Sequence, residues 1–491
     1  MMALRKAGRS SGLREVIRSS SPAQFLFCFF KNLMIISTLS DINTAAITKD
    51  FLWGVASSSF QIEGYPLTDG ASPSIWYNFS HERGKIHNSE NADLACDHYH
   101  RYSEDIGHMK EIGIGAYRFS IAWPRIFPEP GKLNPRGLDF YRRLVDGLLD
   151  AGITPFITIF HWDAPQWFED LGGFLQRKNL DHFIQYGRSL FETLGDRVNH
   201  WITLNEPVFF ALCGYILGNG PPGKRNQFRQ MFTAAHHQLL AHGRLVQEFR
   251  DVLPSGAIGI AEGQLWATPL RPENKRDRQT AEMMDCFLNR LYIDPIILGR
   301  YPELIVDKLG RFLPRAYEQD LKVISTPLDF VGINYYLRQG FRYAPFTPYL
   351  HAKAVHTPTL PRSAMWDYDP VGLYQLLKRL KKEYGNPTCY ITENGFPLPE
   401  REVKSDVDYL DDQERIDYLR EHIGTALRVK AEGVNLNGYF LWSLTDNFEW
   451  DHGYAMRFGL IRVDFESLKR SWRKSAHWYK DLIRHGVLPG G

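Results

Sequence analysis

The sequence predicts an α/β fold that forms a single (β/α)8 TIM barrel, and three observations lead to this prediction. Eight short runs rich in β-branched and aromatic residues alternate with longer amphipathic segments along the 491 residues. The composition stays uniform from about Ile47 onward, without a low-complexity linker. Polar side chains follow nearly every run. Alternating strands and helices are typical of a parallel sheet, and eight such units favour a closed barrel over an open sheet.

The strands and helices are predicted from the spacing of apolar residues. The predicted strands are Phe51–Ala56, Ala116–Trp123, Thr154–His161, His200–Asn205, Ala257–Leu265, Leu328–Tyr335, Thr388–Thr392 and Leu436–Trp442. Between them, apolar residues recur at intervals of three and four, as in Leu138–Leu149, which is typical of amphipathic helices. Asp97 stands directly before another helical segment and is expected to cap it. These elements predict one domain over residues 47–488.

Residues 1–46 differ from the rest and are expected to be an extension that is disordered or dispensable. Residues 1–24 are rich in Arg and Ser, with Glu15 as the only acid, and an apolar run from Phe25 to Ile36 follows. This run is too short to span a bilayer and lacks the clean cleavage site of a secretory signal. A transit-like leader and a true start at Met34 remain open alternatives.

Charge and cysteine usage exclude several classes of protein. The net charge is +2, from 58 basic and 56 acidic residues. Because this sets up no field for polyanions, neither nucleic acid nor membrane partners are expected. The five cysteines are scattered and odd in number, which argues against a disulfide framework or a zinc site and favours a reducing, cytoplasmic location. No HExxH spacing occurs, so neither a metal nor another cofactor is expected.

Polar residues gather at the carboxyl ends of the predicted strands. They are Gln61, Glu63, Arg118, His161, Asp163, Asn205, Glu206, Asn334, Glu393, Asn394, Asp446 and Glu449. In a (β/α)8 barrel these ends converge on one face, where the active site lies. We therefore expect the polar residues to meet at the mouth of the barrel.

Two glutamates in this set suggest a specific reaction. Glu206 closes the fourth strand and Glu393 the seventh, so the two carboxylates can face each other across the barrel mouth. Paired carboxylates perform glycoside hydrolysis: a separation of about 5–5.5 Å gives retention of configuration and about 6.5–9.5 Å gives inversion. Each glutamate could instead form a buried ion pair that stabilises the barrel, but the surrounding polar set favours the catalytic pair.

Several longer motifs identify a family. They are FLWGVASSSFQIEG at 51–64, DHYHRYSED at 97–105, YRFSIAWPRIFP at 117–128, TIFHWD at 158–163, TLNEP at 203–207, ITENG at 391–395 and LWSLTDNFEWDHGYAMRFGL at 441–460. From about residue 49 to 485 the sequence resembles the family 1 glycoside hydrolases, which include the β-glucosidases. The resemblance implies a retaining β-glucosidase that hydrolyses terminal non-reducing β-D-glucosyl residues through a covalent glycosyl-enzyme intermediate. Its substrates would be β-glucosides and cello-oligosaccharides.

The resemblance also implies a role for each matching position. Glu393 would be the nucleophile and Glu206 the acid/base. Residues that bind the non-reducing sugar or adjoin the nucleophile would be Gln61, His161, Asn205, Asn334, Trp442, Glu449 and Trp450, with Arg118 and Tyr336 in contact with Glu393. An arginine beside Glu393 would favour its ionised form, and repulsion from Glu393 would raise the pKa of Glu206 so that it can donate a proton.

The substrate is only partly fixed by the sequence. In relatives that act on 6-phosphorylated sugars the position of Glu449 resembles Ser; a carboxylate there would repel a phosphate, so an unphosphorylated sugar is expected. Ala164 and Pro221 depart from the usual family residues and leave the leaving group open. Transfer to an acceptor sugar, broader β-galactosidase or β-fucosidase activity, and a sugar-binding barrel without turnover are the alternatives. The oligomeric state is not determined.

Overall fold

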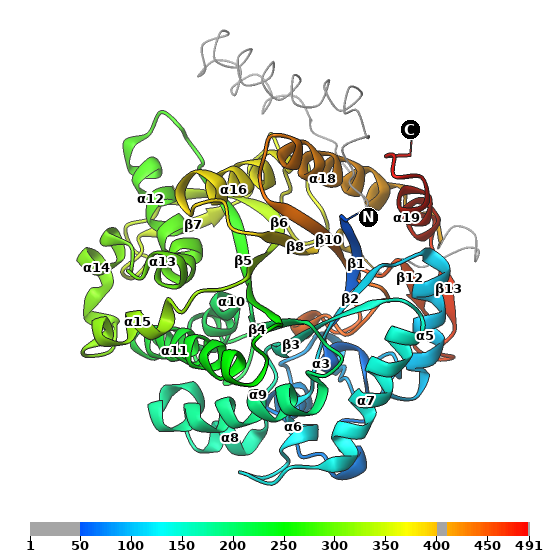
Figure 1. Ribbon diagram of the computed structural model, residues 1–491. Coiled ribbons are helices and arrows are strands. Elements are labelled where there is room, and N and C mark those ends of the chain that lie inside the picture. Colours follow the sequence, from blue (N-terminus) through cyan, green and yellow to red (C-terminus); the bar gives the residue numbers. More distant parts are fainter. Residues whose placement is uncertain (1–49, 400–409, 490–491) are drawn as a thin grey trace, which may run out of the picture. The chain divides into compact units, whose positions relative to one another are not determined.

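A computed structural model describes residues 50–399 and 410–489, and eight parallel strands in it close into a barrel (Figure 1). The barrel strands are β1 (Leu52–Ala56), β2 (Ala116–Ser120), β3 (Thr154–Phe160), β4 (His200–Asn205), β5 (Ala257–Pro269), β6 (Phe330–Tyr343), β8 (Cys389–Asn394) and β10 (Leu436–Trp442). Each hydrogen-bonds to the next in this order, and β10 pairs with β1. The predicted (β/α)8 barrel is confirmed. Residues 1–46 lie outside the described residues, so the domain boundary stays a prediction.

Strands β5 and β6 run further than predicted. Beyond the barrel they remain paired, from Trp266 with Arg338 to Pro269 with Phe341. The short strand β7 (Ala352–Val355) then pairs antiparallel with the end of β6. The apolar pattern of the barrel core stops at the rim, and the predicted strands therefore stop there. Both strands continue beyond the rim because the backbone groups of each extension hydrogen-bond to those of the other.

Helices surround the strands, as Figure 1 shows. The longer helices are α5 (His98–Ile112), α7 (Pro135–Asp150), α9 (Leu180–Leu194), α11 (Phe228–Val252), α12 (Lys275–Asp285), α13 (Leu291–Leu298), α16 (Pro370–Glu383), α18 (Gln413–Ala431) and α19 (Lys474–His485). Shorter ones are α3 (Ser59–Ile62), α4 (Ile75–His81), α6 (Trp123–Ile126), α8 (Gln166–Asp170), α10 (Pro207–Leu212), α14 (Glu303–Leu309) and α15 (Leu321–Ile324). None of the helices in the described ranges is long and apolar enough to cross a bilayer.

The starts of α7 and α5 illustrate how local sequence sets these helices. Pro135 opens α7, where its missing N–H costs nothing, and the predicted apolar stripe from Leu138 to Leu148 is buried. The prediction that Asp97 caps α5 is wrong. Asp97 has a left-handed backbone, with φ 52°, whereas a capping residue needs extended backbone, and its carboxylate contacts the His100 ring at 2.7 Å instead.

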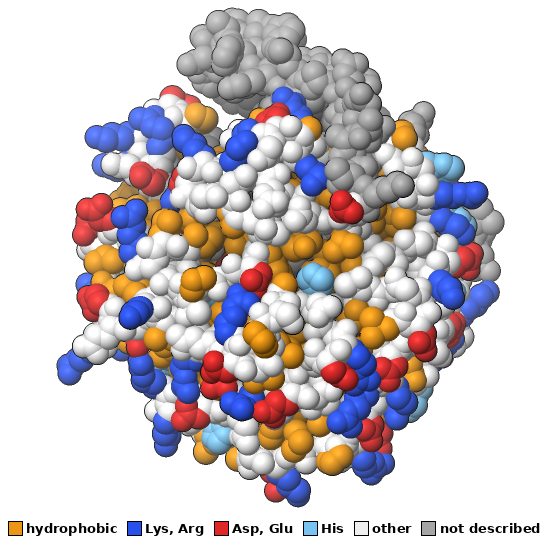
Figure 2. Space-filling model, in the orientation of Figure 1, with side chains coloured by type: hydrophobic (Ala, Val, Ile, Leu, Met, Phe, Trp, Pro, Cys, Tyr) orange, Lys and Arg blue, Asp and Glu red, His pale blue; other side chains and the backbone are white. Residues whose placement is uncertain are grey.

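The interior of the barrel is packed with large rings and small apolar side chains. Phe156 contacts Phe330, Tyr390 and Phe440 with ring centroids 4.9–6.3 Å apart. The rings fill the space that the strands enclose, so polar side chains are left to the carboxyl ends. On the face in Figure 2, hydrophobic side chains gather toward the middle, and basic and acidic side chains are interspersed around the rim.

Candidate active site

Glu206 and Glu393 line one cleft of about 280 Å³ at the carboxyl ends of the barrel strands. Glu393 belongs to the end of β8, and Glu206 follows the last residue of β4. Both side chains are almost fully buried, with 8% and 4% exposure for Glu206 and Glu393. The structure therefore brings the two predicted carboxylates into one site.

The backbone at Glu206 directs its carboxylate into the cleft. Glu206 has a positive φ of 42°, which is uncommon for a residue with a side chain, and Pro207 begins α10 directly after it. The Glu206 N–H donates to the Ala261 carbonyl at 2.8 Å, so the turn is anchored to β5. Unusual backbone of this kind is concentrated at functional sites, where the surrounding structure enforces it.

Glu393 is surrounded by groups that stabilise its charge. Arg118 Nη1 lies 2.6 Å from one carboxylate oxygen, and the Tyr336 hydroxyl donates to the other at 2.8 Å. Burial raises the pKa of Glu393, and Arg118, Tyr336 and Asn334 oppose this rise. The predicted contacts of Arg118 and Tyr336 with Glu393 are present, and they favour the ionised carboxylate.

Glu206 has a different environment. Its hydrogen-bond donor is the neutral amide of Asn334, at 3.0 Å from Oε1. Burial raises the pKa of Glu206 well above its usual range, and repulsion from Glu393 raises it further. Repulsion from Glu393, the cause predicted from the sequence, is therefore smaller than the effect of desolvating the buried carboxylate.

A hydrogen-bond network fixes the orientation of Asn205 and His161. Asn205 Oδ1 accepts from Arg118 Nη2 at 2.6 Å and from Asn334 Nδ2 at 2.9 Å. The Asn205 Nδ2 group therefore donates to His161 Nε2, 3.0 Å away, and the ring hydrogen sits on Nδ1. Burial lowers the pKa of His161 well below its usual value, so the ring is neutral. Among the described residues, the buried Nδ1 has no hydrogen-bond partner.

Glu449 and Gln61 form a second part of the site. Glu449 lines the cleft, whereas Gln61 is fully buried and is not among the described residues that line it. Gln61 Nε2 donates to the Phe448 carbonyl at 2.9 Å and lies 3.4 Å from Glu449 Oε2. Burial, with repulsion from Glu393 and Asp451, raises the pKa of Glu449 to about 8. A direct contact of Gln61 with a sugar stays a prediction.

Aromatic side chains form the apolar walls of the cleft. Trp442 lies 5.7 Å from the His161 ring, and Trp450 lies 4.9 Å from Trp162. Sequence reasoning singled out Trp442 and Trp450 but missed Trp162 and Trp366, which also line the cleft. Trp162 stands within the HWD motif, so its position offered a signal, whereas Trp366 lies in an irregular segment without one.

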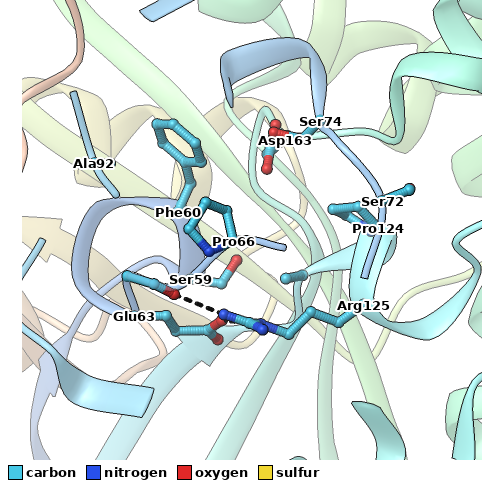
Figure 3. Close-up of a pocket in the computed structure, with 12 residues that line it drawn as sticks. Ser59, Phe60, Glu63, Pro66, Ser72, Ser74, Ala92, Pro124, Arg125 and Asp163 are labelled. Carbon is cyan, nitrogen blue, oxygen red and sulfur yellow. Dashed lines mark hydrogen bonds and ion pairs between the residues drawn. The ribbon is translucent and has the colours of Figure 1, made fainter. Parts of the chain in front are cut away.

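Six of the predicted strand-end residues do not line the cleft. Gln61 and Arg118 still contact the cleft residues Glu449 and Glu393, whereas the other four lie outside it. Glu63 and Asp163 border a separate pocket of about 20 Å³, shown in Figure 3, where Arg125 pairs with Glu63 at 2.8 Å. Asn394 donates to the Tyr335 carbonyl at 2.5 Å, and Asp446 pairs with Arg473 at 2.7 Å. Glu63, Asn394 and Asp446 thus form hydrogen bonds or ion pairs with other buried groups. The expectation that every polar residue at a strand end would join one site is therefore wrong for Glu63, Asp163, Asn394 and Asp446.

Comparison with known proteins identifies the family of this chain. The family model described as glycosyl hydrolase family 1 matches residues 43–487. The chain belongs to glycosyl hydrolase family 1. Family 1 is a family of retaining β-glycosidases. The family resemblance read from the motifs is confirmed.

Named relatives of this family 1 chain cover nearly its whole length. Beta-glucosidase A of Thermotoga maritima is 45% identical over 91% of this chain and 100% of its own. A 1,4-beta-D-glucan glucohydrolase of Thermotoga neapolitana is 46% identical over 89% of this chain and 98% of its own. The solved structure of the family 1 β-glucosidase from Thermotoga maritima superposes with a TM-score of 0.87 at 45% identity, covering 90% of this chain and 99% of that chain.

Proposed function

We propose that Glu393 is the nucleophile and Glu206 the acid/base of this retaining β-glucosidase, which hydrolyses terminal non-reducing β-D-glucosyl residues. The observation that carries this proposal is the unequal environment of two carboxylates in one cleft. Glu393 has a guanidinium and a phenol as partners, whereas Glu206 has a neutral amide. Glu393 therefore ionises first, and Glu206 keeps its proton for the leaving group.

The reaction proceeds in two displacements. Glu393 attacks the anomeric carbon while Glu206 donates its proton to the glycosidic oxygen, so the bond to the leaving group breaks and a covalent glycosyl-enzyme forms. Glu206, now ionised, takes a proton from water as the water attacks the same carbon, and Glu393 departs as a carboxylate. Two inversions at the anomeric carbon give net retention.

The remaining predicted residues hold the sugar or the nucleophile. His161 would supply its unpartnered, neutral Nδ1–H as a donor to a sugar hydroxyl. Asn205 would contact the 2-hydroxyl, where hydrogen bonds strengthen in the transition state. The other proposed contacts are Trp442 under the sugar ring, Gln61, Glu449 and Trp450 at its hydroxyls, Asn334 beside Glu206, and Arg118 and Tyr336 at Glu393.

The proposed substrates are aryl β-glucosides and cello-oligosaccharides. The relative in Thermotoga neapolitana named as a glucan glucohydrolase supports short glucans. A second candidate is broader activity on β-galactosides and β-fucosides, because the Thermotoga maritima β-glucosidase has been solved in complex with galacto-hydroximolactam. Transfer is the other alternative, since an acceptor sugar competes with water for the same glycosyl-enzyme. The described cysteines Cys96, Cys213, Cys286 and Cys389 are free thiols, which supports a reducing, cytoplasmic location.

Azide rescue tests the two roles. Glu393→Gly removes the nucleophile and should abolish hydrolysis of an aryl β-glucoside. Azide can then attack from the face that Glu393 occupied, so the expected product is the α-glucosyl azide. In Glu206→Ala the nucleophile remains and azide attacks the glycosyl-enzyme, so the β-glucosyl azide is expected. Both anomers are read by NMR, with wild-type enzyme in azide as the control. The same anomer from both variants would refute the assignment.

A further inference from the structure

Beyond the residues assigned to the sugar and the reaction, the cleft has a further lining that is mostly apolar. Trp162, Phe209, Met365 and Trp366 line it. Such walls suit a flat or apolar leaving group but do not discriminate by charge. Four polar residues interrupt this lining, and two of them, Asn219 and Asp451, contact each other; the other two are Gln264 and His452.

Asn219 and Asp451 are joined across the cleft rim. Asn219 Nδ2 donates to Asp451 Oδ2 at 3.1 Å, although 232 residues separate them in sequence. Asn219 follows the π-helix η6 (Cys213–Leu217), which continues α10 from the acid/base position. Asp451 lies in the 3₁₀-helix η10 (Trp450–His452), two residues after Glu449. The hydrogen bond therefore links the segment that follows Glu206 to the segment that follows Glu449.

The two residues offer acceptors and negative charge to a ligand. Asn219 Oδ1 is buried and has no partner among the described residues. No Lys or Arg occurs among the described residues that line the cleft, whose imidazoles are His161 and His452. Asp451 is their only carboxylate besides Glu206, Glu393 and Glu449. The field of Asp451 reaches across the site, since it helps to raise the pKa of Glu449 and that of the Cys213 thiol.

We propose that Asp451, held in place by Asn219, is a specificity-determining residue that selects the leaving group of the β-glucoside by charge. It favours leaving groups that carry hydroxyl donors or an ammonium group and disfavours those that carry a carboxylate. This inference rests on the proposed β-glucosidase function and assigns the chemical class of the leaving group that the sequence left open.

The expected size of the effect follows from Coulomb's law. A unit charge on the leaving group about 7 Å from Asp451, at an effective dielectric constant of about 40, changes the specificity constant by roughly fivefold to tenfold. Because the cleft is open to solvent, salt screens this interaction, and the effect should shrink at an ionic strength of about 1 M.

Three phenyl β-D-glucosides, substituted at the para position with carboxylate, hydroxymethyl or aminomethyl, test the proposal. We compare kcat/KM at pH 7 for wild type, Asp451→Asn and Asp451→Ser. The variant-to-wild-type ratio cancels differences in leaving-group acidity. Relative to the hydroxymethyl substrate, both variants should gain about fivefold on the carboxylate and lose about fivefold on the ammonium. Asp307→Asn on the exposed face of α14 removes the same charge outside the cleft and should leave both ratios unchanged.

The possible outcomes distinguish a failure of the proposed role of Asp451 from a failure of the proposed β-glucosidase function. If the folded variants keep wild-type ratios for charged leaving groups while wild type hydrolyses the hydroxymethyl substrate, the role of Asp451 is refuted and the β-glucosidase function stands. If wild type hydrolyses none of the three glucosides, the proposed function itself fails. A shift of equal size in Asp307→Asn would also overturn the inference, because it would reflect net charge rather than the cleft.

Discussion

At the scale of single residues, Glu206 and Glu393 have the same side chain and differ only in their neighbours. Arg118 and Tyr336 contact Glu393, while Asn334 contacts Glu206. Since both carboxylates are buried and interact, they lose their protons as a coupled pair. The rate should therefore follow a bell-shaped dependence on pH whose two limbs belong to the pair.

Tyr336→Phe tests how the acidic limb is set. The Tyr336 hydroxyl lowers the pKa of Glu393, so its removal should raise that pKa and move the acidic limb of kcat/KM to higher pH. A hydrogen bond to a charged group contributes about 1.5–3 kcal/mol, which predicts a shift of about one pH unit or more. The measurement is the pH profile of kcat/KM on an aryl β-glucoside.

Tyr343→Phe, further along the same strand β6, is the matched control and should leave the acidic limb in place. A loss of activity in Tyr336→Phe that is equal at every pH would contradict the prediction. That result would mean that the hydroxyl supports the fold or the substrate and not the charge of Glu393.

At the scale of elements, close packing overrides helix propensity in α11. Gly243 is buried in this helix, and a methyl group there would clash with the Val323 carbonyl of α15. Helix propensity alone predicts that Gly→Ala stabilises an exposed helix by about 1 kcal/mol. The clash is with backbone, which cannot move aside as a flexible side chain can. Packing therefore turns the expected stabilisation by Gly→Ala into a destabilisation.

Gly243→Ala is expected to destabilise the protein by about 1–3 kcal/mol, measured by denaturant unfolding. Gly107→Ala in α5 is the control, because a methyl group at this exposed position meets nothing within 4 Å. It should stabilise by up to about 1 kcal/mol. If both substitutions stabilise, the approach of α11 to α15 does not constrain the helix.

At the scale of the whole molecule, closure of the barrel creates the site. Strands β4 and β8 are not neighbours in the sheet, yet Glu206 and Glu393 share a cleft because all eight strands point their carboxyl ends to one face. The strand that completes the ring is β1, which pairs with both β2 and β10. Closure therefore depends on residues from about 50 onward.

A chain that begins at residue 47 is expected to fold and to keep the kcat/KM of the full chain on an aryl β-glucoside. The family match begins at residue 43, and the barrel begins at Leu52. The control is a chain that begins at residue 60, which lacks β1 and should be insoluble because β2 and β10 lose their shared partner. Loss of activity in the chain that begins at residue 47 would show that residues 1–46 contribute to the enzyme.

The sequence by itself determined the eight strands, the two glutamates at strand ends and the family. Short segments of sequence determine these properties. The periodicity of strands and helices depends on residues a few positions apart, and each glutamate belongs to a continuous motif. Once the barrel was predicted, the general geometry of that fold carried both carboxylates to one face.

Only the tertiary structure decided which strand-end residues enter the cleft, which nitrogen of His161 carries its hydrogen, and that Asn219 contacts Asp451. Glu63 precedes its buried partner Arg125 by 62 positions, and Asn219 precedes Asp451 by 232. Contacts over such separations depend on how loops pack after the barrel closes, and local patterns do not encode that packing. Burial likewise sets the pKa of Glu206, and burial belongs to the assembled fold rather than to any segment of it.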